Sequence, residues 1–130
     1  MVRDCHGEVI ASLTQQLDQA YQPVEVEAMA ANKAVEFGSE LGLHNAIIKG
    51  DSVVVAKALK CKEFGLAPYA HLLKDVSLFS GLYLQLSYSH VKKDSIKVVH
   101  SLARLVLTSQ YCTAWMEDVP SCTYILFRLI

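Results

Sequence analysis

Charge is scarce in this sequence, and the signatures of membrane insertion and secretion are missing. Lys, Arg, Asp and Glu together make up 19% of the chain, below the average of about 25% for soluble domains, and the formal net charge is −1. Any affinity for nucleic acid must therefore come from local patches, because overall charge supplies none. No apolar run reaches the ~18 residues of a transmembrane helix. The first residues lack a signal-peptide pattern, so we expect no membrane partner.

Cysteine pairs with metal-site spacing are also missing. Cys5, Cys61, Cys112 and Cys122 form no CxxC motif, and their spacings match no zinc site. We interpret them as reduced thiols, which predicts an intracellular protein of the nucleus or the cytoplasm. The sequence contains no glycine-rich phosphate loop, no GxSxG and no HExxH, so the enzyme classes that depend on those motifs are excluded.

The sequence does contain an alternation of strand-like and helix-like segments. The predicted strands cover residues 8–13, 45–49 and 83–88, and the predicted helices cover 23–41, 52–60, 68–79 and a segment that starts at Ser95. Hydrophobic residues make up 52% of the 130 residues, which is enough for a packed core in a single domain over residues 1–130. Strands that alternate with helices predict an α/β layered fold with a partly parallel sheet.

The longest predicted helix has clear end signals and an apolar stripe. Pro23 fits its first turn, and Gly42 fits a C-terminal cap. Apolar residues recur at helical spacing and predict the buried stripe, which consists of Val26, Ala30, Ala34, Phe37 and Leu41.

Two carboxylates are candidates for a metal site. Asp51 follows the apolar run 45–48 and therefore lies at the carboxyl end of a predicted strand, where open α/β sheets bind ligands. A carboxylate there is well placed to hold a hard divalent cation, and Glu27, on the preceding helix, could point over the same rim. Each residue also has a common structural interpretation. Glu27 could be a solvated residue favoured by the helix dipole, and Asp51 could be the N-cap of its helix.

Basic and imidazole side chains give weaker signals. Lys92 and Lys93 form a charged turn, which is usually solvated and less often contacts a phosphate. His90 follows a predicted strand and is compatible with an ordinary strand-end histidine. His100 lies one turn into the last predicted helix, and its imidazole suits zinc or copper better than magnesium.

Motifs along the whole chain occur in the order found in one known family. They are, in chain order, residues 2–11, 26–30, 48–52, 90–93 together with 98–103, and 115–120. This set resembles the ribonuclease H-like superfamily, specifically the plant type-1 branch found in non-LTR retroelements and in stand-alone plant proteins. Each motif is weak alone, whereas the ordered set is strong.

The resemblance implies a chemistry and assigns site residues to it. The family hydrolyses the RNA strand of RNA–DNA hybrids with two Mg²⁺ ions held by four carboxylates. Glu27 matches the helix glutamate and Asp51 the strand-end aspartate, which makes both of them catalytic residues and metal ligands. His100 replaces the last catalytic aspartate, while Lys92 and Lys93 match the nucleic-acid-binding turn, where the family has Arg at the position of Lys93. The first aspartate belongs to a strand that this sequence lacks, so we expect impaired catalysis.

The missing strand also has consequences for the fold. In the family the sheet order is 3-2-1-4-5, so the resemblance implies a ribonuclease H-like mixed sheet with flanking helices whose central strand is absent through truncation at the N-terminus. Each buried, unpaired ladder group costs about 1–3 kcal/mol. We therefore expect the strand at 8–13 to slide into the vacancy beside 45–49.

Three functions stay open at this point. The first is a ribonuclease H-type domain that binds RNA–DNA hybrids weakly, with Mg²⁺ as its cofactor and with impaired cleavage. The second is a catalytically dead, retroelement-derived remnant that binds nucleic acid. The third is a plain α/β scaffold without a nucleic-acid role.

Overall fold

A computed structural model describes residues 1–15, 17, 19, 21–92, 113–116 and 124–127. Its elements are, in chain order, β1 (Val2–Arg3), β2 (Val9–Thr14), α1 (Pro23–Glu40), β3 (Asn45–Gly50), α2 (Val53–Cys61), α3 (Ala70–Phe79), the 3-10 turn η1 (Ser80–Leu82), β4 (Gln85–His90), β5 (Thr113–Met116) and β6 (Tyr124–Phe127). The helix predicted from Ser95 lies outside the described residues. The predicted positions of the other helices and strands are confirmed to within a few residues.

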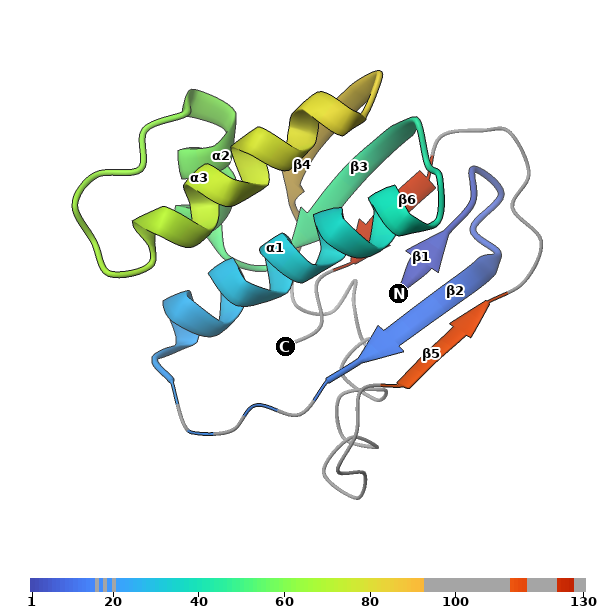
Figure 1. Cartoon of the computed structure of the whole chain (residues 1–130), viewed down its shortest axis with the longest axis horizontal. Coiled ribbons are helices and arrows are strands. Elements are labelled where there is room, and N and C mark those ends of the chain that lie inside the picture. The colour runs from blue at the N-terminus through green and yellow to red at the C-terminus, as the bar shows by residue number, and fades with distance from the viewer. Residues whose placement is uncertain (16, 18, 20, 93–112, 117–123, 128–130) are drawn as a thin grey trace.

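The described strands form one mixed sheet in the order β4-β3-β6-β1-β2-β5. β3 runs parallel to both β4 and β6, and the other neighbours are antiparallel. The helices of the described part of the chain lie on one face of this sheet, with α1 crossing in front of the strands in Figure 1. The expected α/β architecture, a mixed sheet with flanking helices, is therefore confirmed.

The centre of the sheet differs from our expectation. β6, from the C-terminal part of the chain, lies between β3 and β1, with Ile125 opposite Ile47 of β3 and Leu126 opposite Val2 of β1. β2 pairs with β1 and β5 and makes no ladder with β3. The predicted slide of residues 8–13 is wrong, because β6 fills the central position and provides ladder partners to both of its neighbours.

A tight hairpin turn explains why β2 stays beside β1. The buried carboxylate of Asp4 accepts hydrogen bonds from the backbone N–H groups of His6 and Glu8, each at 2.9 Å. Gly7 completes the turn with φ +84°, a conformation that glycine adopts without a Cβ penalty. These contacts fix the pairing of Val2 with Ala11, and a slide of β2 towards β3 would break all of them.

The buried face of α1 is rotated by about one residue from the predicted stripe. Most of the predicted residues are only partly buried: Val26, Ala30, Ala34 and Leu41. Of these, Ala34 and Leu41 still pack against the core. The buried residues of α1 are Glu27, Ala28, Ala31, Val35, Phe37 and Gly38. Several of these are small, which lets the helix axis approach the sheet and keeps the interior densely packed.

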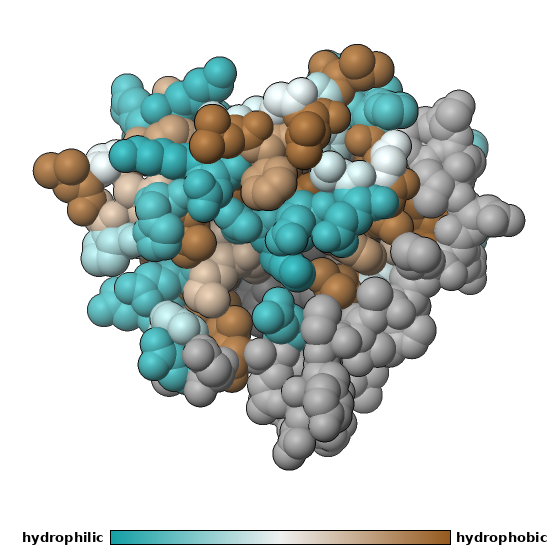
Figure 2. All heavy atoms as spheres, in the orientation of Figure 1, coloured by the Kyte–Doolittle hydropathy of each residue, from teal (hydrophilic) through white to brown (hydrophobic). Residues whose placement is uncertain are grey.

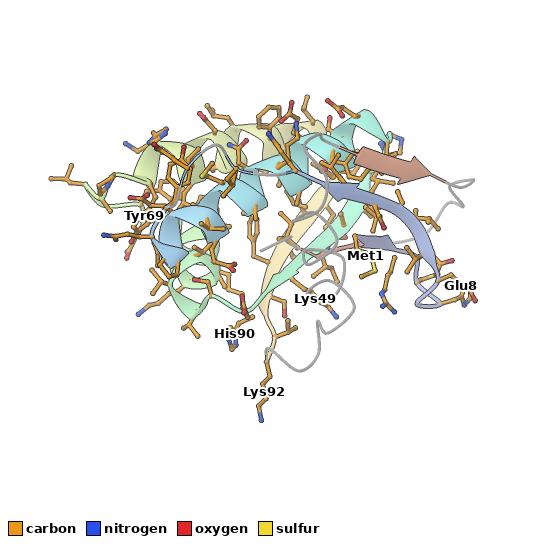
Figure 3. The ribbon with its side chains drawn as sticks, turned by 90° about the horizontal axis from the view of Figure 1, so that it is seen from below. Met1, Glu8, Lys49, Tyr69, His90 and Lys92 are labelled. Carbon is orange, nitrogen blue, oxygen red and sulfur yellow. The ribbon has the colours of Figure 1, made fainter. Side chains whose placement is uncertain are left out.

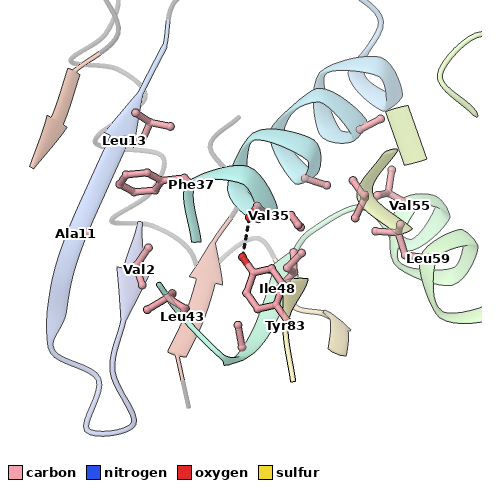
Figure 4. Packing of buried hydrophobic residues seen from close by; sticks show 14 of the residues in the cluster. Val2, Ala11, Leu13, Val35, Phe37, Leu43, Ile48, Val55, Leu59 and Tyr83 are labelled. Atoms are coloured by element: carbon pink, nitrogen blue, oxygen red, sulfur yellow. Dashed lines mark hydrogen bonds between the residues drawn. The ribbon is translucent and has the colours of Figure 1, made fainter. Parts of the chain in front are cut away.

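Tyr83 joins α1 to the segment before β4 inside the core. Its ring is buried, and its hydroxyl donates a 2.6 Å hydrogen bond to the backbone carbonyl of Val35. Figure 4 shows this bond among the aliphatic side chains of the core, with Phe37 packed beside Leu13. Burial raises the pKa of the Tyr83 phenol above its usual range.

The surface shown in Figure 2 carries separate apolar spots among polar side chains. The exposed large apolar residues of the described part include Val53, Leu66, Leu78, Leu82 and Leu84. Leu84 precedes β4 and is exposed to solvent, whereas Leu86 and Tyr88 of β4 pack against the core. None of the described helices is long and apolar enough to cross a membrane.

Candidate metal and nucleic-acid site

Asp51 lies between the end of β3 and the start of α2. The residue that caps α2 is its neighbour Ser52, whose hydroxyl accepts a hydrogen bond from Val55 N–H at 3.3 Å. Ser52 has the extended backbone typical of an N-cap, with φ −90° and ψ 110°. The interpretation of Asp51 as the N-cap is therefore wrong.

The Asp51 carboxylate is left without a structural partner in the described part of the protein. It is half-buried, and no hydrogen bond or ion pair joins it to another described residue. A strand-end carboxylate that neither caps a helix nor pairs with a cation keeps its oxygens available for a ligand.

Glu27 is a buried carboxylate in the second turn of α1. Only 6% of its surface is exposed, so the interpretation as a solvated surface residue is wrong. Glutamate is almost never fully buried without a specific role or partner. Its place beside the fully buried Ala28 and Ala31 turns it towards the sheet.

The chain topology brings Glu27 and Asp51 towards the same edge of the sheet. β2 is antiparallel to β1, β1 is antiparallel to β6, and β6 is parallel to β3, so β2 and β3 point the same way. The helix that connects them, α1, must then begin near the carboxyl ends of these strands and run back, as Figure 1 shows. The second turn of α1 and the residue after β3 therefore occupy the same rim.

The basic candidates lie at this rim where the structure describes them. β4 ends at His90, and both His90 and Lys92 are exposed. Lys93 and His100 lie outside the described residues. Within the described segments no group of three or more His, Cys, Asp or Glu side chains is arranged to hold a metal ion. The metal role of Glu27 and Asp51 thus remains a prediction that rests on two ligands.

Sequence reasoning missed two features of the site. It gave no role to Lys49, which precedes Asp51 by two residues at the end of β3. It also assigned no strand to residues 124–127, which form β6 at the centre of the sheet. Residues 124–127 are visibly apolar in the sequence, but no local signal indicates that they form a strand between β3 and β1.

Comparisons with known proteins support the class that this topology defines. The structure is similar to the crystal structure of ribonuclease H1 from the halophilic archaeon Halobacterium salinarum NRC-1, with a TM-score of 0.55, 19% identity and coverage of 59% of each chain. At that identity the similarity establishes a ribonuclease H-like fold, and the chain spans little more than half of that protein. No curated protein matches the chain.

The sequence itself supplies the family. Residues 1–106 match the family described as Reverse transcriptase-like. Because the match covers most of the chain, the protein belongs to the reverse transcriptase-like family of the ribonuclease H-like superfamily.

Proposed function

We propose that the protein is a ribonuclease H-type domain that binds RNA–DNA hybrids and holds Mg²⁺ with Glu27 and Asp51, with impaired cleavage of the RNA strand. The observation that carries this proposal is a pair of carboxylates at one rim of the sheet, of which one is buried and the other lacks a structural partner among the described residues. A carboxylate at the strand end that makes no structural contact, as Asp51 does among the described residues, contributes little stability, which favours a functional role for it.

The donor set fits magnesium. Carboxylate oxygens are hard ligands that suit Mg²⁺, which is usually bound through one or two protein carboxylates with several waters retained. When bound, Mg²⁺ would polarise a phosphoryl oxygen and lower the pKa of a coordinated water. Burial among the small residues of α1 restricts the rotamers of Glu27, while Asp51 follows a strand whose ladder fixes the backbone.

The composition of β6 supports the impairment. This central strand consists of Tyr, Ile, Leu and Phe, so it adds no carboxylate to the rim. Two carboxylates compensate the charge of two Mg²⁺ ions poorly. His100, which stands where the family resemblance implies an acidic ligand, adds no negative charge. A catalytically dead, retroelement-derived domain that only binds nucleic acid is the second candidate, and the same observation favours it.

Binding would follow the rules for duplexes that contain RNA. The protein would recognise the width of the groove and the 2′-hydroxyl groups, without reading sequence. Lys92 and Lys93 would contact phosphates, and the net charge of −1 predicts weak and salt-sensitive binding.

We further propose an intracellular location in the nucleus or the cytoplasm, plant type-1 ancestry, and one domain over residues 1–130.

A hybrid binding and cleavage assay tests this function. The 130-residue protein should retard a labelled RNA–DNA hybrid and cleave it slowly or not at all in Mg²⁺. Asp51→Asn and Glu27→Gln should abolish any residual cleavage and weaken Mg²⁺ binding measured by calorimetry. Asp75→Asn, which changes an exposed carboxylate on α3, is the matched control. Absence of hybrid binding, or rapid cleavage that survives Asp51→Asn, would overturn the proposal.

A further inference from the structure

The ladder between β3 and β4 continues past the last paired residues and brings basic residues beside Asp51. Lys49 lies opposite Ser89, and Gly50 lies opposite His90. The N–H of Val91 then donates to the carbonyl of Gly50 at 2.9 Å. In a parallel ladder this bond places Val91 beside Asp51, so His90 and Lys92 flank the position of Asp51 on the neighbouring strand.

Three basic side chains occupy this end of the two strands. Figure 3 shows Lys49, His90 and Lys92 towards the carboxyl ends of β3 and β4, the end from which the chain continues into α2. Lys49 is half-buried, whereas His90 and Lys92 are exposed. Among the described side chains no ion pair engages either lysine. Their donors are therefore available to an external anion.

The pleat of the strands places these groups on both sides of the sheet edge. Lys49 shares a face with Asn45 and Ile47, the face opposite the buried Ala46 and Ile48, whereas Gly50 and its neighbour His90 belong to the helix-covered face. A partner that touches all three groups must therefore cross the end of the sheet, passing over Asp51. An extended polyanion has the required shape, while a small anion would reach only one side.

We propose that Lys49, His90 and Lys92 form a cationic rim that receives the sugar–phosphate backbone of one strand of an RNA–DNA hybrid and brings it across Asp51. This inference rests on the proposed function and extends it by naming two further contact residues and the path of the strand. Lys92 lies three residues beyond the partner of Lys49, which is about 10 Å along the strand direction at about 3.3 Å per residue.

The chemistry of the rim favours phosphodiesters over an acidic protein segment. All three groups are donors, with two fixed charges and one imidazole N–H. A backbone phosphate that follows them would approach the Asp51 carboxylate, and a divalent cation held there would relieve the repulsion between the two anions. Binding of the hybrid and of Mg²⁺ should therefore reinforce each other.

A salt titration with matched variants tests the rim. We compare the full chain with Lys49→Met/Lys92→Met and with the control Lys60→Met/Lys74→Met, which removes two exposed helix lysines elsewhere. The probe is a fluorescent RNA–DNA hybrid in Ca²⁺, followed by anisotropy from 50 to 300 mM KCl. Loss of two phosphate contacts should reduce the slope of log K against log[salt] by about 1.8, and should weaken binding about 30-fold at 0.15 M if affinity at 1 M is unchanged.

The remaining arms separate the possible failures. His90→Gln should weaken binding less than the double variant, and replacing Ca²⁺ by EDTA should weaken binding to the unmodified chain. If the slope of log K against log[salt] for Lys49→Met/Lys92→Met equals that of the unmodified chain or of the control variant, the proposal of a cationic rim is wrong. Hybrid binding by the unmodified chain would still support the proposed function in that case. Competition by poly-glutamate as effective as by the hybrid would assign the rim to an acidic protein and overturn our assignment.

Discussion

Replacement of Tyr83 by phenylalanine removes one hydroxyl and leaves the shape of the core almost unchanged. The ring is buried, and its hydroxyl donates to the Val35 carbonyl at 2.6 Å. A net intramolecular hydrogen bond contributes about 0.5–1.5 kcal/mol. The Val35 carbonyl lies inside α1 and keeps its place in the helix ladder, so no acceptor becomes orphaned. We expect Tyr83→Phe to lower the free energy of unfolding by about 1 kcal/mol at pH 7.5.

The same variant carries a pH signature. Burial raises the pKa of Tyr83 in the folded protein, whereas in the unfolded chain the phenol titrates near its usual value of about 10. The stability associated with the neutral phenol is therefore complete below pH ~10 and is lost as the pH rises above it, because the unfolded state then releases the proton first. Tyr83→Phe should thus be less stable than the unmodified chain at pH 7.5 and should gain relative to it between pH 10 and 11.

Urea unfolding followed by circular dichroism, at pH 7.5 and at a pH between 10 and 11, measures these differences in the free energy of unfolding. Tyr88→Phe is the matched control, since Tyr88 is half-buried with a raised pKa and its hydroxyl has no hydrogen bond to another described residue. It should lose little at pH 7.5. Two results would refute the reasoning. One is a free energy of unfolding for Tyr83→Phe within about 0.3 kcal/mol of that of the unmodified chain at pH 7.5. The other is an equal loss of stability of Tyr83→Phe and the unmodified chain when the pH is raised above 10.

Two further predictions concern the ends of α2. Ser52→Ala removes the N-cap hydrogen bond from Val55 and should lower the free energy of unfolding by about 1 kcal/mol. Asp51→Ala should lower it by less than half of that amount. Thermal unfolding of the two variants measures both losses, and equal losses would show that Asp51 is the capping residue. Lys62 ends α2 with φ 55°, in the left-handed region, so Lys62→Gly should stabilise the fold by about 0.5–1 kcal/mol. Lys60→Gly, inside the helix, should destabilise it by about 1 kcal/mol, and a stabilising effect of both changes in chemical denaturation would contradict this account.

Local chemistry determined much of the fold from the sequence alone. Pro23 begins α1, as predicted, because its fixed φ suits the first turn and its missing N–H has no helical acceptor there. Gly42 follows the last turn with φ +76°, as predicted, because few other residues tolerate that conformation. The apolar run before Gly50 predicted β3, because a short apolar segment followed by a turn signal is typical of a buried strand. These interactions extend over a few residues, so the sequence contains all the information needed to predict them.

The candidate site could be predicted only in part from the sequence. The sequence pointed to Glu27 and Asp51 as a pair, and the topology places both at one rim. Whether Glu27 is buried or solvated depended on a rotation of α1 by one residue, which the small side chains on its true inner face allowed. Whether Asp51 or Ser52 caps α2 depended on backbone angles that both residue types accept. The cationic rim needed the register between β3 and β4 before Lys49 could be placed beside His90.

Only the tertiary structure decided what occupies the centre of the sheet. Residues 124–127 form β6 between β3 and β1, and their partners lie at sequence separations of about 80 and more than 120 residues. Any apolar strand of suitable length can satisfy a ladder, because backbone hydrogen bonding does not depend on side-chain identity. The hairpin turn at Asp4 holds β2 beside β1, so β6 occupies the position between β3 and β1. Which strand occupies that position depends on the whole arrangement of the chain, and no local sequence pattern predicts it.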